Sequence, residues 1–346
     1  MFFLPPEVQL DVFKYLNFNQ LFSVKQTNFY FRNLISKYER ELARMEFFEL
    51  SIISENEKCR SYTEIENKLG NFEFTLNNQL RKRWQQAIDK AIPLFLNKYG
   101  SGLLLYMKTF VDEGSRCYIL KLPTFPRNID EMIIVRCCLE QLFNCAFKYA
   151  YFDKCIFNLQ IIDILFDNYH KTIPPPQFHV QKSYLFASNI FASNIYLLPT
   201  SVLNFSLNNL SIFESLNIDF TNIRITKKYT NILFNILING GNKFPKICLT
   251  SFMLKKLYEM IMEYIQTTST DCSKMVAFIK LNCVSLPNFK LNERAENIEI
   301  GQGNNASKYT KYQIANYYNP KLRFSICNNV WSSSASFYIQ IKKMKE

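Results

Sequence analysis

Apolar side chains recur at helical spacing in three short stretches at the start of the chain. Between about Pro6 and Leu16, apolar side chains fall on one stripe and polar ones on the other, which predicts an amphipathic helix. Pro5 and Pro6 favour a helix start, because a proline in the first turn leaves no N–H unpaired. A second helix is predicted over about residues 20–26, and a third after Asn28, a favourable N-cap residue.

These three helices carry more apolar side chains than they can bury among themselves. A segment of about 45 residues rarely forms a stable core alone, and the first cysteine, Cys59, lies outside it. Each buried Leu, Val or Phe contributes about 1.5–3 kcal/mol, so the remaining apolar surface must lean on something. Either the rest of this chain or a second protein covers it, and composition alone favours the rest of the chain.

Beyond residue 100, strand-like runs alternate with helical stretches. Approximate strand centres recur at steps of about 25–40 residues, which fits a strand plus a helix or loop stacked as a solenoid. The centres are Ile119, Asp153, His179, Asn217, Cys248 and Phe278. The stretch 203–218 carries a partial leucine-rich-repeat pattern without a repeated asparagine ladder. We therefore expect an α/β (α+β) protein with an irregular, leucine-rich-repeat-like array. A compact α/β domain is the alternative fold.

The chain divides into three parts on this pattern. Residues 1–45 form the three-helix segment, and residues 101–346 the α/β array, closed after Gly303 by antiparallel strands. Between them, residues 46–100 hold a polar stretch and a helix over about 76–91, ended by Pro93. This middle part is predicted to be a helical linker.

Composition narrows the class of protein. Apolar residues make up 48% of the chain and aromatic residues 16%, which excludes a disordered protein. No run of eighteen apolar residues exists, and the opening lacks the pattern of a signal peptide, so we expect a cytoplasmic or nuclear protein without a membrane span. The ten cysteines form no CxxC pair and have no nearby CxxH, which argues against zinc and for small buried side chains.

The net charge of +12 suggests an acidic partner, a nucleic acid or solubility. The densest cluster, Arg81-Lys82-Arg83, lies in the predicted linker helix and is best explained as a solvated helix face. The remaining lysines are scattered, whereas nucleic-acid binding favours a concentrated basic stripe, so nucleic acid is not the favoured partner.

Residues for catalysis are scarce. His170 and His179 are the only histidines, and no HExxH, P-loop, GxGxxG or GxSxG motif is present. Cys137 and Cys138 lie in an apolar helical stretch with no histidine assigned nearby, so structural thiols are favoured over nucleophiles. We expect no enzyme activity and no cofactor.

The order of residues in the first segment carries more than helical spacing. It opens with Leu-Pro-x-Glu, its first helix ends in Tyr-Leu, and its third helix ends in an aromatic residue, two polar residues and Leu-Ile. The matching residues are Leu4, Pro5, Glu7, Tyr15, Leu16, Leu21, Phe31, Arg32, Leu34 and Ile35. Over about 40 residues this pattern resembles the F-box. Thr27 stands where that family usually has valine, and Phe31 where tryptophan is common.

The resemblance implies a partner. F-box helices dock on a Skp-family adaptor, and through it on a cullin, while the rest of the chain holds a target protein for ubiquitination. The residues expected to touch the adaptor are Leu4, Pro5, Val8, Val12, Phe13, Leu16 and Leu21. The segments YILKLPTFP and FDKCIF also resemble the C-terminal regions of the expanded nematode F-box families. The alternative is a repeat-type scaffold that binds protein or nucleic acid and is unrelated to ubiquitin.

Overall fold

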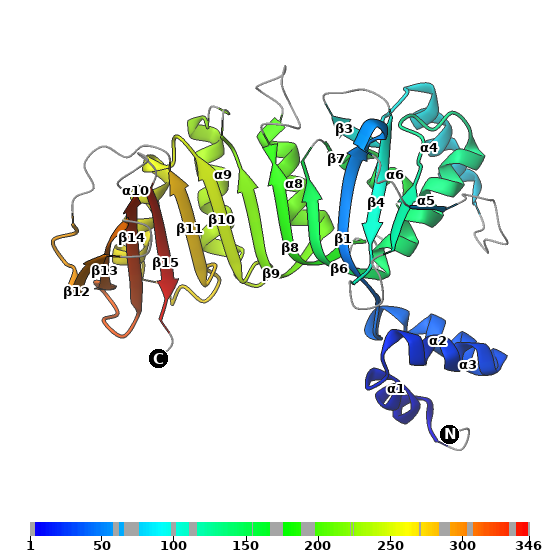
Figure 1. The fold of residues 1–346 in the computed structure, drawn as a ribbon, viewed down its shortest axis with the longest axis horizontal. Helices are drawn as coiled ribbons and strands as arrows, with labels where there is room; N and C mark the ends of the chain where they lie inside the picture. The colour runs from blue at the N-terminus through cyan, green and yellow to red at the C-terminus, as the bar shows by residue number, and fades with distance from the viewer. Residues whose placement is uncertain are drawn as a thin grey trace.

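A computed structural model describes most of the chain. The described residues are 4–57, 62–65, 76–97, 102–110, 116–153, 155–166, 176–187, 198–221, 223, 225–269, 271–283, 291–302, 307–331 and 337–344. Three N-terminal helices are followed by one long sheet with helices packed on it (Figure 1). The expected mixed α/β class with an N-terminal three-helix segment is therefore confirmed.

The three N-terminal helices begin at the residues that favour helix starts. They are α1 (Pro6–Lys14), α2 (Phe18–Thr27) and α3 (Phe29–Lys37), followed by the short 3₁₀ helix η1 (Glu39–Glu41). Asn17 and Gln20 form a reciprocal capping box at the start of α2, and the Asn28 side chain accepts a hydrogen bond from the Phe31 N–H at 2.9 Å. Local polar residues thus define the ends of α2 and the start of α3.

The sheet has thirteen strands among the described residues, in the order β12-β13-β14-β15-β11-β10-β9-β8-β6-β1-β4-β5-β2, and β3 and β7 form a separate pair. The strands up to β8 are β1 (Met45–Ser54), β2 (Thr63–Ile65), β3 (Phe95–Asn97), β4 (Leu103–Lys108), β5 (Cys117–Leu120), β6 (Cys145–Phe152), β7 (Cys155–Phe157) and β8 (Phe178–Phe186). The remaining strands are β9 (Leu210–Asp219), β10 (Lys246–Ser251), β11 (Phe278–Cys283), β12 (Glu296–Gln302), β13 (Ser307–Ala315), β14 (Arg323–Trp331) and β15 (Phe337–Lys343). The helices of this part are η2 (Glu55–Glu57), α4 (Asn78–Asp89), α5 (Ile129–Phe143), α6 (Leu159–Leu165), α8 (Leu198–Asn209), α9 (Lys227–Asn239) and α10 (Lys255–Thr267).

The centre of the sheet is a series of parallel strands, and a helix lies between each strand and the next along the chain from β6 to β11. Ala150, Ser183, Leu216, Ile247 and Ile279 occupy one row of register partners from β6 to β11, so successive strands are 33, 33, 31 and 32 residues apart. This step agrees with the predicted interval of about 25–40 residues. The specific likeness to leucine-rich repeats is not confirmed and stays a prediction.

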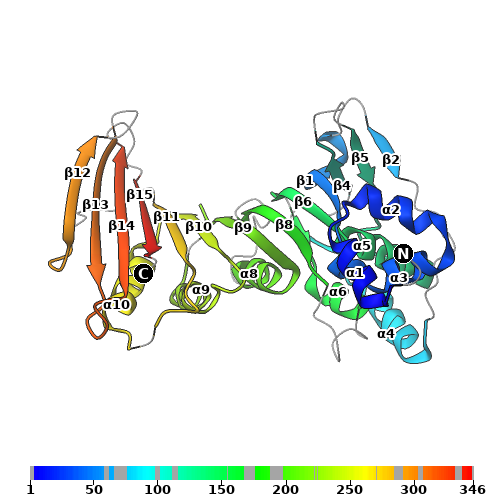
Figure 2. The same ribbon diagram turned by 90° about the horizontal axis from the view of Figure 1, so that it is seen from below.

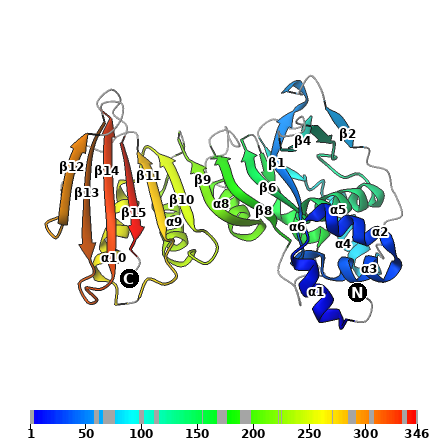
Figure 3. The same ribbon diagram turned by 60° about the horizontal axis from the view of Figure 1, so that its bottom comes forward.

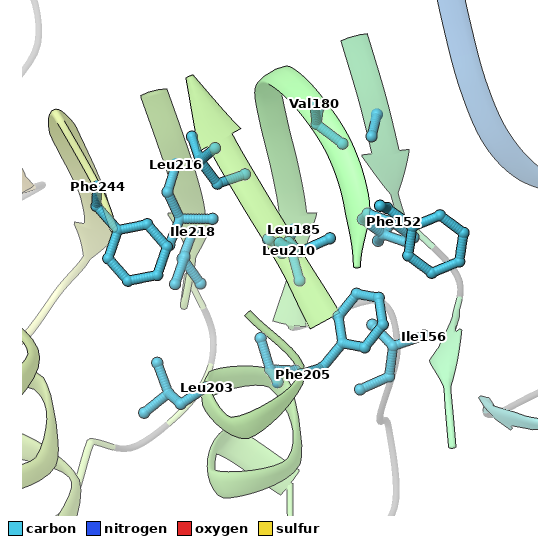
Figure 4. Packing of buried hydrophobic residues seen from close by; sticks show 14 of the residues in the cluster. Phe152, Ile156, Val180, Leu185, Leu203, Phe205, Leu210, Leu216, Ile218 and Phe244 are labelled. Atoms are coloured by element: carbon cyan, nitrogen blue, oxygen red, sulfur yellow. The ribbon is translucent and has the colours of Figure 1, made fainter. Parts of the chain in front are cut away.

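The helices of the array cover one face of the sheet. Helices α6, α8, α9 and α10 lie on the same side, and the sheet bends so that both ends turn away from them (Figure 2). The strands contribute alternate side chains to this covered face, where Phe205 of α8 packs edge-on against Phe152 of β6 at 5.1 Å between ring centroids (Figure 4). The opposite face of the central strands, which we call the free face, carries none of these four helices.

The prediction of a helical linker over residues 46–100 needs correction. The helix expected over about 76–91 is present as α4, but residues 45–54 form β1, which lies between β4 and β6 inside the sheet. Phe47, Leu50 and Ile52 are buried in the main core. Trp84 of α4 is buried too and donates a hydrogen bond to the Ile164 carbonyl at 3.1 Å. This segment therefore belongs to the array.

The end of the chain closes the sheet as expected. Strands β12 to β15 pair antiparallel with one another, and β15 pairs antiparallel with β11. The parallel series thus ends against a four-stranded antiparallel extension.

We predict that the N-terminal helices can lose their packing without unfolding the sheet. Phe13→Ala removes a fully buried ring from those helices and should cost about 3–5 kcal/mol locally. Both tryptophans, Trp84 and Trp331, lie in the array, so tryptophan fluorescence reports on the array alone. During urea unfolding of the variant, helical circular dichroism should fall first, with the tryptophan transition unchanged.

Phe205→Ala is the control for this experiment, because Phe205 is buried between α8 and the sheet. It should lower the midpoint of the tryptophan transition. If Phe13→Ala shifts both signals together and by the same amount, the N-terminal helices and the sheet share one core.

Candidate functional site

The three N-terminal helices, which we call the helical module, have an apolar core of their own. Its buried members are Phe13, Leu21, Phe31, Leu34, Ile35 and Leu42. Phe13 and Phe31 meet edge to face at 5.7 Å between ring centroids. This cluster is separate from the main core between the sheet and its helices. The module therefore does not press its apolar residues into the array.

Other apolar side chains of the module stay in contact with solvent. Leu4 and Val8 are 41% and 42% exposed, and they stand one turn apart at the start of the chain. The Gln9 side chain donates a hydrogen bond to the Leu4 carbonyl at 2.6 Å and ties this start to α1. Further exposed apolar side chains of the module are Tyr15, Phe22, Phe29 and Tyr30. The module thus presents apolar surface that nothing in the described structure covers.

The residues predicted to touch the adaptor fall into three groups. Leu4, Pro5 and Val8 are exposed. Val12 and Leu16 are half-buried, and Leu16 packs on the module core.

Phe13 and Leu21 are buried inside the module core, and this placement corrects the prediction for them. Helical spacing puts Phe13 near Val12 on α1, but the way α1 crosses α2 and α3 decides which side chain is enclosed. A buried ring cannot contact a partner while the module stays folded. Their role is to hold the module together.

The module is attached where the parallel strands begin. Leu42 ends the module core and β1 starts at Met45, so the chain passes from one unit to the other within three residues. Arg44 donates a hydrogen bond to the Phe143 carbonyl at 3.0 Å, and Asn144 donates one to Glu39 at 3.3 Å. The module consequently lies at the amino ends of the central strands (Figures 1 and 3).

The free face of the sheet carries aromatic rings and lysines. Tyr151 and Tyr184, neighbours on β6 and β8, stack at 5.1 Å between ring centroids. Also on β6, the Lys148 ammonium lies 5.6 Å from the Tyr149 ring and 5.5 Å from the ring of Phe48 on the neighbouring strand β1. The row of Tyr151 and Tyr184 continues through Asn217, Cys248, Lys280 and Gln340 on β9, β10, β11 and β15. The free face thus combines aromatic rings with polar and charged side chains.

The thiols of this chain are protonated at neutral pH wherever a shift is resolved. Burial raises the pKa of Cys138 to about 11 and that of Cys145 to about 12, and it also raises the pKa of Cys137. A nucleophilic cysteine needs the opposite shift, so these pKa values argue against a nucleophilic role for Cys137, Cys138 and Cys145. In the part of the chain that the structure covers, no three His, Cys, Asp or Glu side chains gather as a metal site.

Only one of the two histidines lies in the described part of the chain. His170 lies outside the described residues. His179 is in β8, where burial, aided by the nearby Arg44 guanidinium, lowers its pKa to about 4. Its ring lies 6.1 Å from that of Phe213 on β9. A neutral, stacked histidine in a strand is a packing residue.

Sequence comparison adds one similarity. The model of a family described as a domain of unknown function (DUF8381) matches residues 65–221, which are 157 of the 346 residues. This stretch spans the region from the end of β2 to just beyond β9. No F-box family model matches the chain. No curated protein and no solved structure matches it either.

None of the described helices has both the length and the apolar character needed to span a membrane.

His179 should make stability depend on pH. The pKa of His179 is about 4 in the folded state and about 6.5 when unfolded, so only the unfolded state gains a proton as the pH falls from about 6.5 to about 4. The folded state therefore loses stability over that range. Because the ring is partly exposed, we expect about 1 kcal/mol between pH 7 and pH 5.

Urea unfolding of the wild type and of His179→Asn at both pH values measures this effect. The wild type should lose more stability on acidification than the variant does. An equal loss in both proteins would show that His179 does not carry the effect.

Proposed function

We propose that this protein is the substrate-recognition subunit of a Skp/cullin/F-box ubiquitin ligase. One observation carries the proposal: the helical module satisfies its own core and leaves Leu4 and Val8 in water instead of packing them on the array. The order of residues in the module, which resembles the F-box, gives the partner. That partner is a Skp-family adaptor, which in turn binds a cullin. The complex acts in the cytoplasm or nucleus.

The proposed interface rests on apolar burial. Transfer of a Leu or Val side chain from water to an apolar interface contributes about 1.5–3 kcal/mol when it is complete. Leu4, just before α1, and Val8 on α1 supply part of this gain, and half-buried Val12 lies one turn beyond Val8 on the same helix. Exposed apolar patches rimmed by polar residues are typical of protein–protein contacts.

The array supplies the second half of the proposed function. A receptor needs no catalytic residue of its own, because it acts by holding a target near the subunit that transfers ubiquitin and so raises the effective concentration of the target lysines. The short attachment between Leu42 and Met45 and the hydrogen bonds of Arg44 and Asn144 keep the module in a defined place beside the sheet. The array can then present a target in a constant orientation.

Adaptor binding tests the proposal. In the full-length chain, Leu4→Asp combined with Val8→Asp places two charges in the proposed interface and should weaken binding to a purified Skp-family adaptor at least about 100-fold. Binding is measured by isothermal titration calorimetry. Both side chains are exposed, so circular dichroism of the variant should match the wild type.

A matched control changes the same residue types elsewhere. Leu291 and Val330 are 40% and 47% exposed and lie in the array, so Leu291→Asp combined with Val330→Asp should bind the adaptor as the wild type does. Adaptor binding that is unchanged in the first variant, or undetectable in the wild type, removes the proposal and leaves a scaffold unrelated to ubiquitin.

A further inference from the structure

A groove of about 690 Å³ lies where α9 and α10 begin. Its walls combine lysines with apolar side chains, among them Lys227, Lys255, Lys256, Phe252, Met253 and Met260. Phe252 and Met253, which follow the end of β10, are 42% and 55% exposed. The groove therefore offers both charge and apolar contact to a ligand.

The charge of the groove is positive. Lys227, Lys255 and Lys256 are exposed, and among the described residues Glu259 is the only acidic one in the walls. Glu259 lies 3.6 Å from Lys256. Across the described residues, neither Lys227 nor Lys255 forms an ion pair, so two ammonium groups face the groove without a carboxylate.

The positions of these lysines conflict with helix electrostatics. The start of a helix carries partial positive charge, and a lysine there costs about 0.3–1 kcal/mol. Both α9 and α10 nevertheless begin with Lys-Lys, have no acidic residue in the first turn and lack a side-chain cap. By contrast, asparagine side chains cap α2, α3, α4, α5 and α6, at Asn17, Asn28, Asn77, Asn128 and Asn158. Both helix starts thus depart from the usual capping and charge pattern, and no salt bridge to Lys227 or Lys255 within the described structure compensates for it, as is expected at a functional site.

The location of the groove agrees with this interpretation. Phe252 and Met253 follow the carboxyl end of β10, while the helical module precedes the amino end of β1, and both strands belong to the parallel series. In α/β sheets, ligands bind preferentially outside the carboxyl ends of parallel strands. The groove and the module thus lie at opposite ends of the parallel strands.

We propose that this groove binds an acidic peptide segment of a partner protein, with carboxylates on Lys227 and Lys255 and an apolar side chain against Phe252 and Met253. Charge complementarity selects the carboxylates, and the flexible side chains of Met253 and Met260 adapt to the apolar residue. A single-stranded nucleic acid needs successive aromatic platforms, and Phe252 is the only aromatic residue that the described part of the chain places in the walls. The identification of this partner as a ubiquitination target rests on the proposed function; the binding itself does not.

Peptide selection against the full-length chain tests the groove. A phage-displayed library of random dodecapeptides should yield clones enriched in Asp and Glu around at least one Leu, Ile or Phe. The strongest clone is then made as a fluorescein-labelled peptide and titrated by fluorescence anisotropy. Replacing its acidic residues by Asn and Gln should abolish binding.

Variants of the chain locate the site. Lys227→Glu combined with Lys255→Glu should weaken peptide binding at least about 30-fold, and Met253→Ser about threefold to tenfold. Lys308 and Lys321 are exposed lysines on another part of the array, so Lys308→Glu combined with Lys321→Glu changes the net charge equally and should leave binding within about twofold. The milder Lys255→Gln, with an expected loss of about fivefold, keeps the test valid if the double variant misfolds.

Three results would overturn the inference. They are enriched peptides without acidic residues, equal loss in the groove and control doubles, and full binding by the groove double.

Peptide and adaptor binding are separable outcomes. Leu4→Asp combined with Val8→Asp should keep the peptide and lose the adaptor, and Lys227→Glu combined with Lys255→Glu should do the reverse. Peptide binding at the groove without any adaptor binding supports the groove and refutes the ligase. Adaptor binding without selection of acidic peptides supports the ligase and refutes the groove.

Discussion

The rest of the structure depends on two apolar cores that do not merge. Six buried side chains fill the helical module, and a much larger set joins the sheet to its helices. Leu42, in the core of the module, and Met45, at the start of β1, mark the passage between the two. The core of the module does not include Leu4 or Val8, which are both exposed. These side chains remain in water, and a protein that keeps them there has a surface suited to a second polypeptide.

The parallel strands give this arrangement a direction. The strands β1, β6, β8, β9, β10 and β11 run in the same direction. A segment that enters one of these strands therefore lies at their amino ends, and a segment that leaves one lies at their carboxyl ends. The module lies at the amino ends and the lysine groove at the carboxyl ends. A ten-residue strand such as β9 spans about 33 Å, and the groove follows β10, four strands away from β1, so the two proposed docking sites are separated by at least about that length. One chain could therefore hold an adaptor and an acidic segment at once, without competition between them.

Local features were predictable from the sequence, and features made by distant residues were not. Asn28 and the two prolines correctly marked helix starts, because a cap needs only its neighbours. Strand β1 was missed since its place depends on pairing with β6, which brings Leu50 beside Ala150 one hundred residues later. Phe13 and Leu21 were assigned to the surface because spacing cannot tell which side of a stripe other helices cover. Lys227 and Lys255 are 28 residues apart in the sequence and line one groove only because α9 packs beside α10. The Lys-Lys pairs at the two helix starts were the sequence signal that could have indicated this groove.

Hydrogen–deuterium exchange of the full-length chain with and without a purified Skp-family adaptor tests the central claim most directly, because it reads every backbone amide in one experiment. If the module offers its uncovered side to the adaptor, exchange should slow in α1 and along the neighbouring helices, while the amides of β6 to β11 exchange as in the free protein. Slowed exchange on the sheet with none in α1, or no change anywhere at saturating adaptor, would contradict the account.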